Sequence, residues 1–440
     1  DCHLLDHVFN DLSPQLWSAL PQRALVEGYA TPVTCDLFDD PAGQFEYSRL
    51  TFDPSYAVSC QGGPIAAASA SGEWADTSYV YNAQSNPTGT RCTVQDYGVA
   101  VWGRRAADGF ANRPYDNTGV QYGLSALNQG LITAGQFVDL NEKIGGIDID
   151  WNYQPQRSVA DPFALTVAYR GGRVDYPRES AKVPIIDLRG FSPEEIHTDV
   201  HSYSMRARLD QANGNHDNQV IWNGGAALFP DPGAFATSFL TMDAWLSAIE
   251  ADTSSDPLEV KVVRNKPAGA VDACWIGEQK ITDAAVCAAA FPYFGTPRIA
   301  AGGPLADNIF KCQLKPLDRA SYSVSFTDAQ WAQLQSAFPT GVCDYAQAPV
   351  GWQPTVPWLS YAGGPGGQPL GDAPKSMAIS PAQAHTRFGG AVGICTSMLL
   401  VLGALVRRRL RQARRQVRRC AGGAVSGWAR SCPGPSARRG

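Results

Sequence analysis

The sequence predicts an α/β fold, and three stretches support this prediction. Residues 183–186 form an apolar run that ends in DLRG at 187–190, a pattern typical of a short buried strand leading into a loop. Residues 234–251 carry apolar side chains at helical spacing and predict an amphipathic helix with Trp245 in the core. Thr133 opens a capping box, which predicts a further helix. Strands and helices in this arrangement are typical of an α/β domain.

The composition limits the classes of protein and partner. The chain has 440 residues, of which 44% are hydrophobic, enough for a sizeable core. Residues 381–440 contain 12 of the 36 basic residues and no acidic residue, so the first 380 residues hold 24 basic and all 41 acidic side chains. Such an acidic body repels the phosphates of nucleic acids, and we therefore expect no nucleic-acid partner.

The cysteines indicate an oxidising compartment. Eight of the 11 cysteines lie in the body and three in the C-terminal tail, with no CxxC and no zinc-binding spacing. An even number of dispersed cysteines is typical of disulfides in an extracytoplasmic protein, whereas eight free thiols in a cytosolic protein are the alternative. Short separation along the chain favours the pairs Cys35–Cys60 and Cys274–Cys287.

Shifts in composition divide the chain into segments. The expected segments are a helical segment (1–30), an irregular disulfide-rich lid (31–130), the C-terminal part of an α/β domain (131–348), a Pro/Gly-rich linker (349–388), a membrane span (389–406) and a basic tail (407–440). Within the α/β domain, the β-branched run at 258–263 predicts a further strand.

The tail predicts a C-terminal membrane anchor. Residues 389–406 are uncharged and mostly apolar, and an arginine-rich run follows at once. This length suffices for a short membrane span, and the arginines would remain on the cytoplasmic side with the body outside. The alternative is that the arginine-, glycine- and alanine-rich tail is GC-rich DNA read in the wrong frame.

Residues 182–222 concentrate titratable groups beside the first predicted strand. They include three of the six histidines, His197, His201 and His216. In open α/β sheets the functional groups lie on loops beyond the carboxyl ends of the strands. His216 lies in the turn-rich loop NGNHDN (213–218), which can present an imidazole above a sheet, and we interpret it as a general base.

Several carboxylates are candidates for orienting this base. Glu194 is favoured, because its neighbour Glu195 fits a capping box that begins at Ser192. Asp187 and Asp199 are the alternatives.

Two patterns resemble metal sites in part. His197 and His201 are four residues apart, on one face if helical, but no third ligand is evident. Asp148 and Asp150 resemble the start of a calcium loop, but the glycine and the closing glutamate of that loop are missing. We therefore expect neither a metal nor a cofactor.

Several long stretches resemble an uncharacterised family of secreted bacterial proteins, the domain of unknown function 6351 (DUF6351) family. The matching stretches are NPTGTRCT (86–93), GFANRPYDNTGVQYGL (109–124), FVDLNEKIGGIDID (137–150), VPIIDLRG (183–190), NGNHDNQVIW (213–222), DACW (272–275), TPRIAAGGPLADNIFKCQLKP (296–316) and FPTGVCDY (338–345). The layout is also distantly similar to tannases and feruloyl esterases.

This resemblance implies the C-terminal part of an α/β-hydrolase-like sheet with a large disulfide-rich lid insertion. It also implies serine hydrolase activity on an ester or another small molecule. A serine nucleophile of this fold lies on a G-x-S-x-G elbow, and the sequence contains none. The family's elbow lies upstream of a segment like DCHLLDHVF (1–9), so we expect a truncated member that carries His216 and Glu194 and is inactive alone. The alternative is a non-catalytic, membrane-anchored surface protein with a hydrolase-like fold. The oligomeric state stays open.

Overall fold

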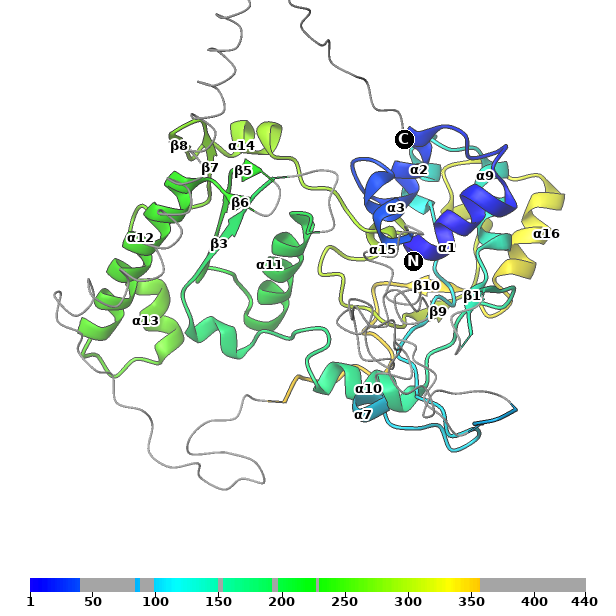
Figure 1. The fold of residues 1–440 in the computed structure, drawn as a ribbon, viewed down its shortest axis with the longest axis horizontal. Helices are drawn as coiled ribbons and strands as arrows, with labels where there is room; N and C mark the ends of the chain where they lie inside the picture. Colours follow the sequence, from blue (N-terminus) through cyan, green and yellow to red (C-terminus); the bar gives the residue numbers. More distant parts are fainter. Residues whose placement is uncertain (40–83, 88–98, 149–152, 192–196, 227–228, 357–440) are drawn as a thin grey trace, which may run out of the picture. The chain divides into compact units, whose positions relative to one another are not determined.

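The structure is a computed structural model of the chain, and two groups of packed elements are visible in it (Figure 1). The residues that it describes are 1–39, 84–87, 99–148, 153–191, 197–226 and 229–356. One group is a mainly helical core, and the other is a four-stranded sheet with its flanking helices. Each is treated by itself below.

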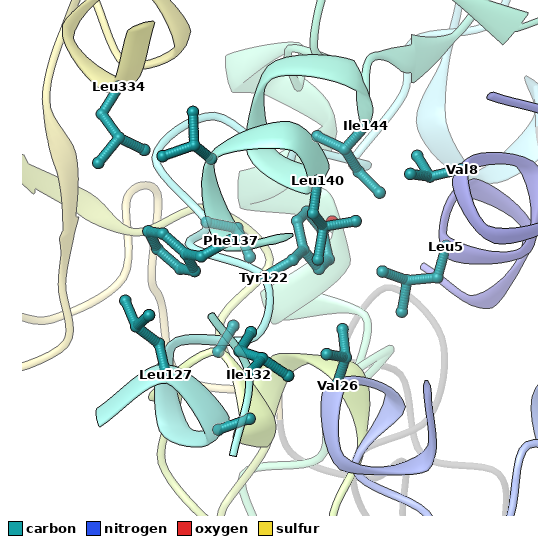
Figure 2. Close-up of a cluster of buried hydrophobic side chains, with 14 of the residues drawn as sticks. Leu5, Val8, Val26, Tyr122, Leu127, Ile132, Phe137, Leu140, Ile144 and Leu334 are labelled. Atoms are coloured by element: carbon teal, nitrogen blue, oxygen red, sulfur yellow. The ribbon is translucent and has the colours of Figure 1, made fainter. Parts of the chain in front are cut away.

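The helical core unites segments that are far apart in the sequence. Its helices are α1 (Cys2–Asp6), the π-helix η1 (His7–Leu12), α2 (Leu20–Glu27), α8 (Leu124–Asn128), α9 (Ala134–Lys143) and α16 (Asp328–Ala337). Leu5, Tyr122 and Leu140 are fully buried and point into one cluster (Figure 2). Each buried side chain of this size contributes roughly 1.5–3 kcal/mol, so this cluster is the main source of stability in the described part. Val120, Tyr122 and Leu127, at the end of the predicted lid, belong to it.

Local signals fix the ends of two of these helices. Thr133 and Gln136 form the predicted capping box at the start of α9: the Gln136 amide donates to Thr133 Oγ1 at 3.2 Å, and the Thr133 amide donates to Gln136 Oε1 at 2.9 Å. Thr327 and Gln330 use the same geometry at the start of α16. Each box satisfies amide groups that a helix leaves unpaired at its first turn.

Three disulfides lie within the described residues. Cys274–Cys287 confirms the prediction. The prediction of Cys35–Cys60 is wrong, because Cys35 pairs with Cys2 and thereby ties α3 (Val33–Asp39) to α1. Cys60 lies outside the described residues.

The third disulfide, Cys312–Cys343, belongs to the helical core. It links the residue that precedes β9 (Gln313–Lys315) to β10 (Val342–Asp344), and these two strands are antiparallel. The remaining short elements outside the main sheet are α7 (Val99–Trp102), β1 (Gly146–Ile147), β2 (Tyr153–Gln154), α10 (Pro162–Arg170), η2 (Glu179–Lys182), β5 (Gly225–Ala226), β6 (Phe229–Pro230), α15 (Pro297–Ala300) and η3 (Arg319–Ser321).

The second group is built on a mixed sheet. Its strands are β3 (Ile185–Arg189), β4 (Gln219–Asn223), β7 (Ala273–Ile276) and β8 (Gln279–Ile281), in the order β3-β4-β7-β8. The first three are parallel, and β8 returns antiparallel to β7. The strand predicted at 183–186 is therefore confirmed as β3, shifted towards the carboxyl end. The prediction that it is buried is wrong, because β3 lies at the edge of the sheet and all five of its residues are partly exposed. All five residues of β4 are buried, as a central strand requires.

Helices cover both faces of this sheet. The helix α12 (Pro232–Ala251) lies on one side of the strands and α11 (Val200–Asn213) on the other (Figure 1). Trp222 and Trp275 pack against Ala234 of α12 on the first face. On the second face, Arg189 donates to Ser202 of α11, and the Cys274–Cys287 disulfide holds α14 (Ala284–Ala290).

The strand predicted at 258–263 is wrong, because these residues form the helix α13 (Leu258–Arg264). Pro257 precedes its first turn, Glu259 lies in that turn and Arg264 in the last, which are the favoured positions for a helix. Val262 packs with Trp245 of α12, and this tertiary contact outweighs the strand propensity of a short β-branched run.

The helix predicted at 234–251 is confirmed as α12, and Trp245 is fully buried as expected. The other part of the prediction is wrong, because much of the predicted apolar face is exposed. Phe235, Phe239 and Leu246 of that face are 50%, 64% and 43% exposed. The helix is apolar on several sides, so its sequence pattern alone does not identify the face that packs.

No helix among the described residues is long and apolar enough to cross a membrane. The stretch 389–406 and the basic tail 407–440 lie outside those residues, so the predicted anchor is not tested.

Glu27 of α2 is a buried carboxyl group within the helical core region. Its side chain is fully buried, and neither of its carboxyl oxygens has a hydrogen-bond partner in the described part of the chain. Burial, followed by the nearby charges of Asp6 and Asp36, raises the pKa of Glu27 to about 9. The group is therefore neutral at pH 7.

We expect Glu27→Gln to raise the free energy of unfolding at pH 7 by about 2–3 kcal/mol. The folded carboxyl keeps its proton up to about pH 9, whereas the unfolded one loses it near 4.5, so folding takes up a proton between these values. Stability of the wild type therefore falls as pH rises through this window, and the variant loses that slope. Urea unfolding at pH 5, 7 and 8 measures it, with the exposed Glu250→Gln as control. If the free energies of unfolding of the wild type and Glu27→Gln changed with pH in parallel, the raised pKa of Glu27 would be contradicted.

Candidate functional site

A cavity of about 380 Å³ lies against the sheet face that carries α11 and α14. Its lining comes from four elements that are distant in sequence and includes Tyr203 of α11, Ile221 and Asn223 of β4, Cys287 of α14 and Tyr293. We call this cavity the α11–α14 pocket. Its volume is in the range of pockets that bind small organic molecules.

Aromatic rings form one wall of the α11–α14 pocket. Tyr203 and Tyr293 are stacked, with ring centroids 3.9 Å apart and an interplanar angle of 22°. Phe291 also lines the pocket and meets Phe191, which follows β3, edge to face at 5.5 Å. Rings braced against one another in this way present a rigid, flat surface to a ligand.

Among the described residues that line the α11–α14 pocket, Asp272 is the charged one. Arg206 of α11 donates to both of its carboxylate oxygens, at 2.5 and 2.8 Å, and the Ile221 amide donates to it at 2.9 Å. Burial acts to raise the pKa of Asp272, but these hydrogen bonds and the charges of Arg206 and His216 together hold it below its usual value. Asp272 is therefore ionised at neutral pH and ties α11 to the start of β7.

Asn223 is the last residue of β4, and its side chain is buried, with 4% of the residue exposed. Burial raises the pKa of the Tyr203 phenol, and a hydrogen bond with the Asn223 side chain opposes that rise. The Oδ1 atom of Asn223 is buried and has no hydrogen-bond partner among the described residues.

His216 lies in the loop between α11 and β4. Its Nδ1 atom is 2.8 Å from Asp210 Oδ1, and 40% of its side chain is exposed. The loop precedes β4, so it lies at the amino end of that strand, and the expectation of a carboxyl-end loop is wrong. His216 is not among the described residues that line the α11–α14 pocket, and its charge is the smallest of the causes that lower the pKa of Asp272.

The partner carboxylate of His216 is Asp210, which the sequence analysis missed. Asp210 lies in the last turn of α11, and Gly214, with a left-handed φ of 78°, ends the helix and turns the chain back towards it. In the sequence, a glycine that ends the helix indicates that the chain reverses its direction there. His216, two residues after Gly214, is thereby brought back to the last turn of α11.

The other candidate carboxylates are those that the sequence suggested as partners of His216, and their neighbours. Glu194 and Glu195 lie outside the described residues. Asp187 lies within β3 and forms an ion pair with Arg189 at 3.4 Å, and Asp199 is buried immediately before α11. Their roles as the orienting acid stay predictions.

The described residues contain no group of three side chains that could hold a metal ion. His197 and His201 are both exposed there, and Asp150 lies outside the described part.

Comparison with known proteins places the chain in a family. Residues 1–354 match the model of the tannase-like family of unknown function (DUF6351). Neither the curated proteins nor the solved structures contain a match to the chain. Because the matched residues make up most of the 440, the chain belongs to the tannase-like family of unknown function.

Proposed function

We propose that this protein is an extracytoplasmic hydrolase of the esterase type, built on an α/β-hydrolase-like sheet, which holds a small ester substrate in the α11–α14 pocket. The tannase-like family and the parallel strands flanked by helices support this proposal. The observation that carries it is a small-molecule cavity with an aromatic wall. The pair of His216 and Asp210 lies in and before the loop that leads into β4, one of the strands that line this cavity.

In this proposal His216 is the general base and Asp210 orients it. A carboxylate at Nδ1 favours the tautomer that carries its proton on that atom, which leaves Nε2 as the proton acceptor. Glu194, favoured from the sequence, is the rival orienting acid. No serine of the chain is assigned as nucleophile, because none lies on a G-x-S-x-G elbow.

The location outside the cytoplasm is supported by disulfides. Three disulfides among the described residues are consistent with an oxidising compartment. The anchor at 389–406 is proposed from the sequence alone.

Turnover of p-nitrophenyl acetate by the full product of the gene tests the catalytic roles. We expect His216→Gln to lower kcat/KM by about 100-fold or more, because that is the usual contribution of a general base. Asp210→Asn is expected to lower kcat/KM by about tenfold, through loss of tautomer control. The matched control is Asp11→Asn, since Asp11 pairs with His7 at the same 2.8 Å distance on the helical core.

Two outcomes would contradict these assignments. Unchanged turnover in His216→Gln would remove the base. A full gene product that neither turns over aryl esters nor reacts with a fluorophosphonate probe would leave the non-catalytic surface protein as the better interpretation.

A further inference from the structure

One side of α12 carries an exposed stripe of large apolar side chains. Phe235 and Phe239 are each at least half exposed, and the other members of the stripe are partly exposed. The side chains that α12 buries in its own group of elements, such as Ala234 and Trp245, lie on a different side of the helix. We call the exposed stripe the α12 seam, and its residues are Phe235, Phe239, Met242, Leu246 and Ile249.

The spacing within the α12 seam is that of a helix that pairs with another helix. Successive members are four, three, four and three residues apart. Alternating steps of three and four residues place apolar side chains at the a and d positions of a heptad, where each inserts between side chains of a facing helix. The seam therefore has the geometry for a second helix, in addition to the contacts that α12 makes within its own group.

The α12 seam is held in place before any partner arrives. The Asp231 side chain caps the first turn of α12, and on the buried side Trp245 Nε1 donates to the Val262 carbonyl at 2.8 Å. Phe235 and Phe239 meet edge to face, with ring centroids 5.1 Å apart. A helix that is already ordered loses little conformational entropy when it associates.

The charges of α12 restrict the kind of partner. Its residues 232–251 contain no Lys, Arg or His, and Asp243 is the one charged residue between the ends of the seam. A helix that lies on an anionic membrane needs basic residues beside its apolar side, so this composition disfavours a lipid surface. A facing helix with an equally apolar seam requires no such residues.

The exposed area suits a dimer of moderate affinity. The two phenylalanine rings alone expose about 200 Å², and the whole seam exposes on the order of 350 Å². A standard interface buries about 800 Å² per partner, of which roughly 60% is non-polar. The α12 seam of each copy therefore supplies most of the apolar part of such an interface.

We propose that the α12 seam is a self-association surface, on which α12 of a second copy of this chain packs across a two-fold axis. A two-fold axis brings the same surface of both copies together, so a seam of this kind is its own complement. Because α12 and the α11–α14 pocket lie on opposite faces of the sheet, the pairing does not involve the pocket. The proposal is therefore independent of the hydrolase assignment.

Sedimentation equilibrium of the purified full chain tests the proposal. We expect a dimer with a dissociation constant on the order of 10 μM. Phe239→Glu is expected to weaken it at least about 100-fold, because a carboxylate would be buried in the seam. The matched control is Leu240→Glu, which makes the same change of charge at the next residue, outside the seam, and should leave the dissociation constant unchanged. Both side chains are mostly exposed, at 64% and 75%, so both variants are expected to fold.

A cross-link decides the question if Phe239→Glu does not fold. Met242 is the middle residue of the seam, so the two-fold axis brings the two copies of Met242 together. With oxidised glutathione as the oxidant, Met242→Cys is expected to form a covalent dimer. Ala244→Cys, which is exposed and lies away from the seam, is expected to remain uncrosslinked under the same conditions.

Three results would overturn the proposal. The first is a wild-type protein that remains monomeric up to about 200 μM. The second is a dimer that Phe239→Glu and Leu240→Glu weaken equally, or in which Met242→Cys and Ala244→Cys cross-link equally, because the interface would then lie elsewhere. The third is a monomer that binds lipid vesicles through Phe239, or whose stability to urea falls in Phe239→Glu but not in Leu240→Glu. A membrane or another segment of the same chain would then cover the seam.

Discussion

Replacing Arg157 by methionine is expected to lower the free energy of unfolding by about 3 kcal/mol, because several buried acceptors would lose their donor together. The Arg157 guanidinium donates to the carbonyl oxygens of Asn117, Val120 and Asn141 at 2.7–3.0 Å. It also lies over the ring of Phe338, 4.6 Å from the centroid. Burial lowers the pKa of Arg157 to about 10, so it remains charged at neutral pH.

Arg157 thus joins three segments of the helical core, two of which are also linked by the hydrogen bond from the Asn117 amide to the Ser158 carbonyl. Lysine keeps the charge but not the planar fork, so Arg157→Lys is expected to recover only part of the loss. Urea unfolding provides the measurement, and the exposed Arg170→Met is the control. A change below about 0.5 kcal/mol, the usual size for surface substitutions, would show that water replaces the guanidinium without cost.

The second large effect concerns the Cys274–Cys287 disulfide. The helix α14 has no fully buried side chain, yet Ala284, Cys287 and Ala288 line the α11–α14 pocket. The disulfide therefore holds one wall of the pocket against β7. For cysteines 13 residues apart, its removal is expected to lower the free energy of unfolding by about 2–3 kcal/mol.

Removal of this disulfide is also expected to weaken the binding of phenol, used as a small aromatic probe of the α11–α14 pocket, by about tenfold, because α14 must then be ordered when the ligand binds. The double variant Cys274→Ser/Cys287→Ser tests both effects, by urea unfolding and by ligand-observed NMR. The matched control is Cys312→Ser/Cys343→Ser, which removes a disulfide of the helical core. It should lose stability but keep its affinity for phenol. Equal affinity of all three proteins would show that α14 holds its position without the disulfide.

The sequence by itself determined the features that depend on neighbouring residues. The Thr133 capping box, the strand β3, the helix α12 and the disulfide Cys274–Cys287 were all predicted correctly. Capping is decided by hydrogen bonds within three residues, and a disulfide over 13 residues closes a short loop. The long family stretches likewise identified the tannase-like family.

The tertiary structure decided everything that depends on partners far along the chain. Residues 258–264 form the helix α13 rather than a strand because Val262 packs against Trp245. Cys35 forms its disulfide with Cys2 rather than with Cys60. The buried face of α12 is likewise set by what packs against it, because the helix is apolar on several sides.

The candidate site also depends on contacts between residues that are far apart in the sequence. His216 was identified from its loop, but its partner Asp210 and its place at the amino end of β4 follow from the direction in which the chain enters the sheet. The α11–α14 pocket combines residues from 203 to 293, and no short window of sequence contains its aromatic wall. Capping hydrogen bonds and hydrophobic periodicity can be predicted from short segments of the sequence. Pockets arise from packing between residues that are far apart in the sequence, which only the folded chain establishes.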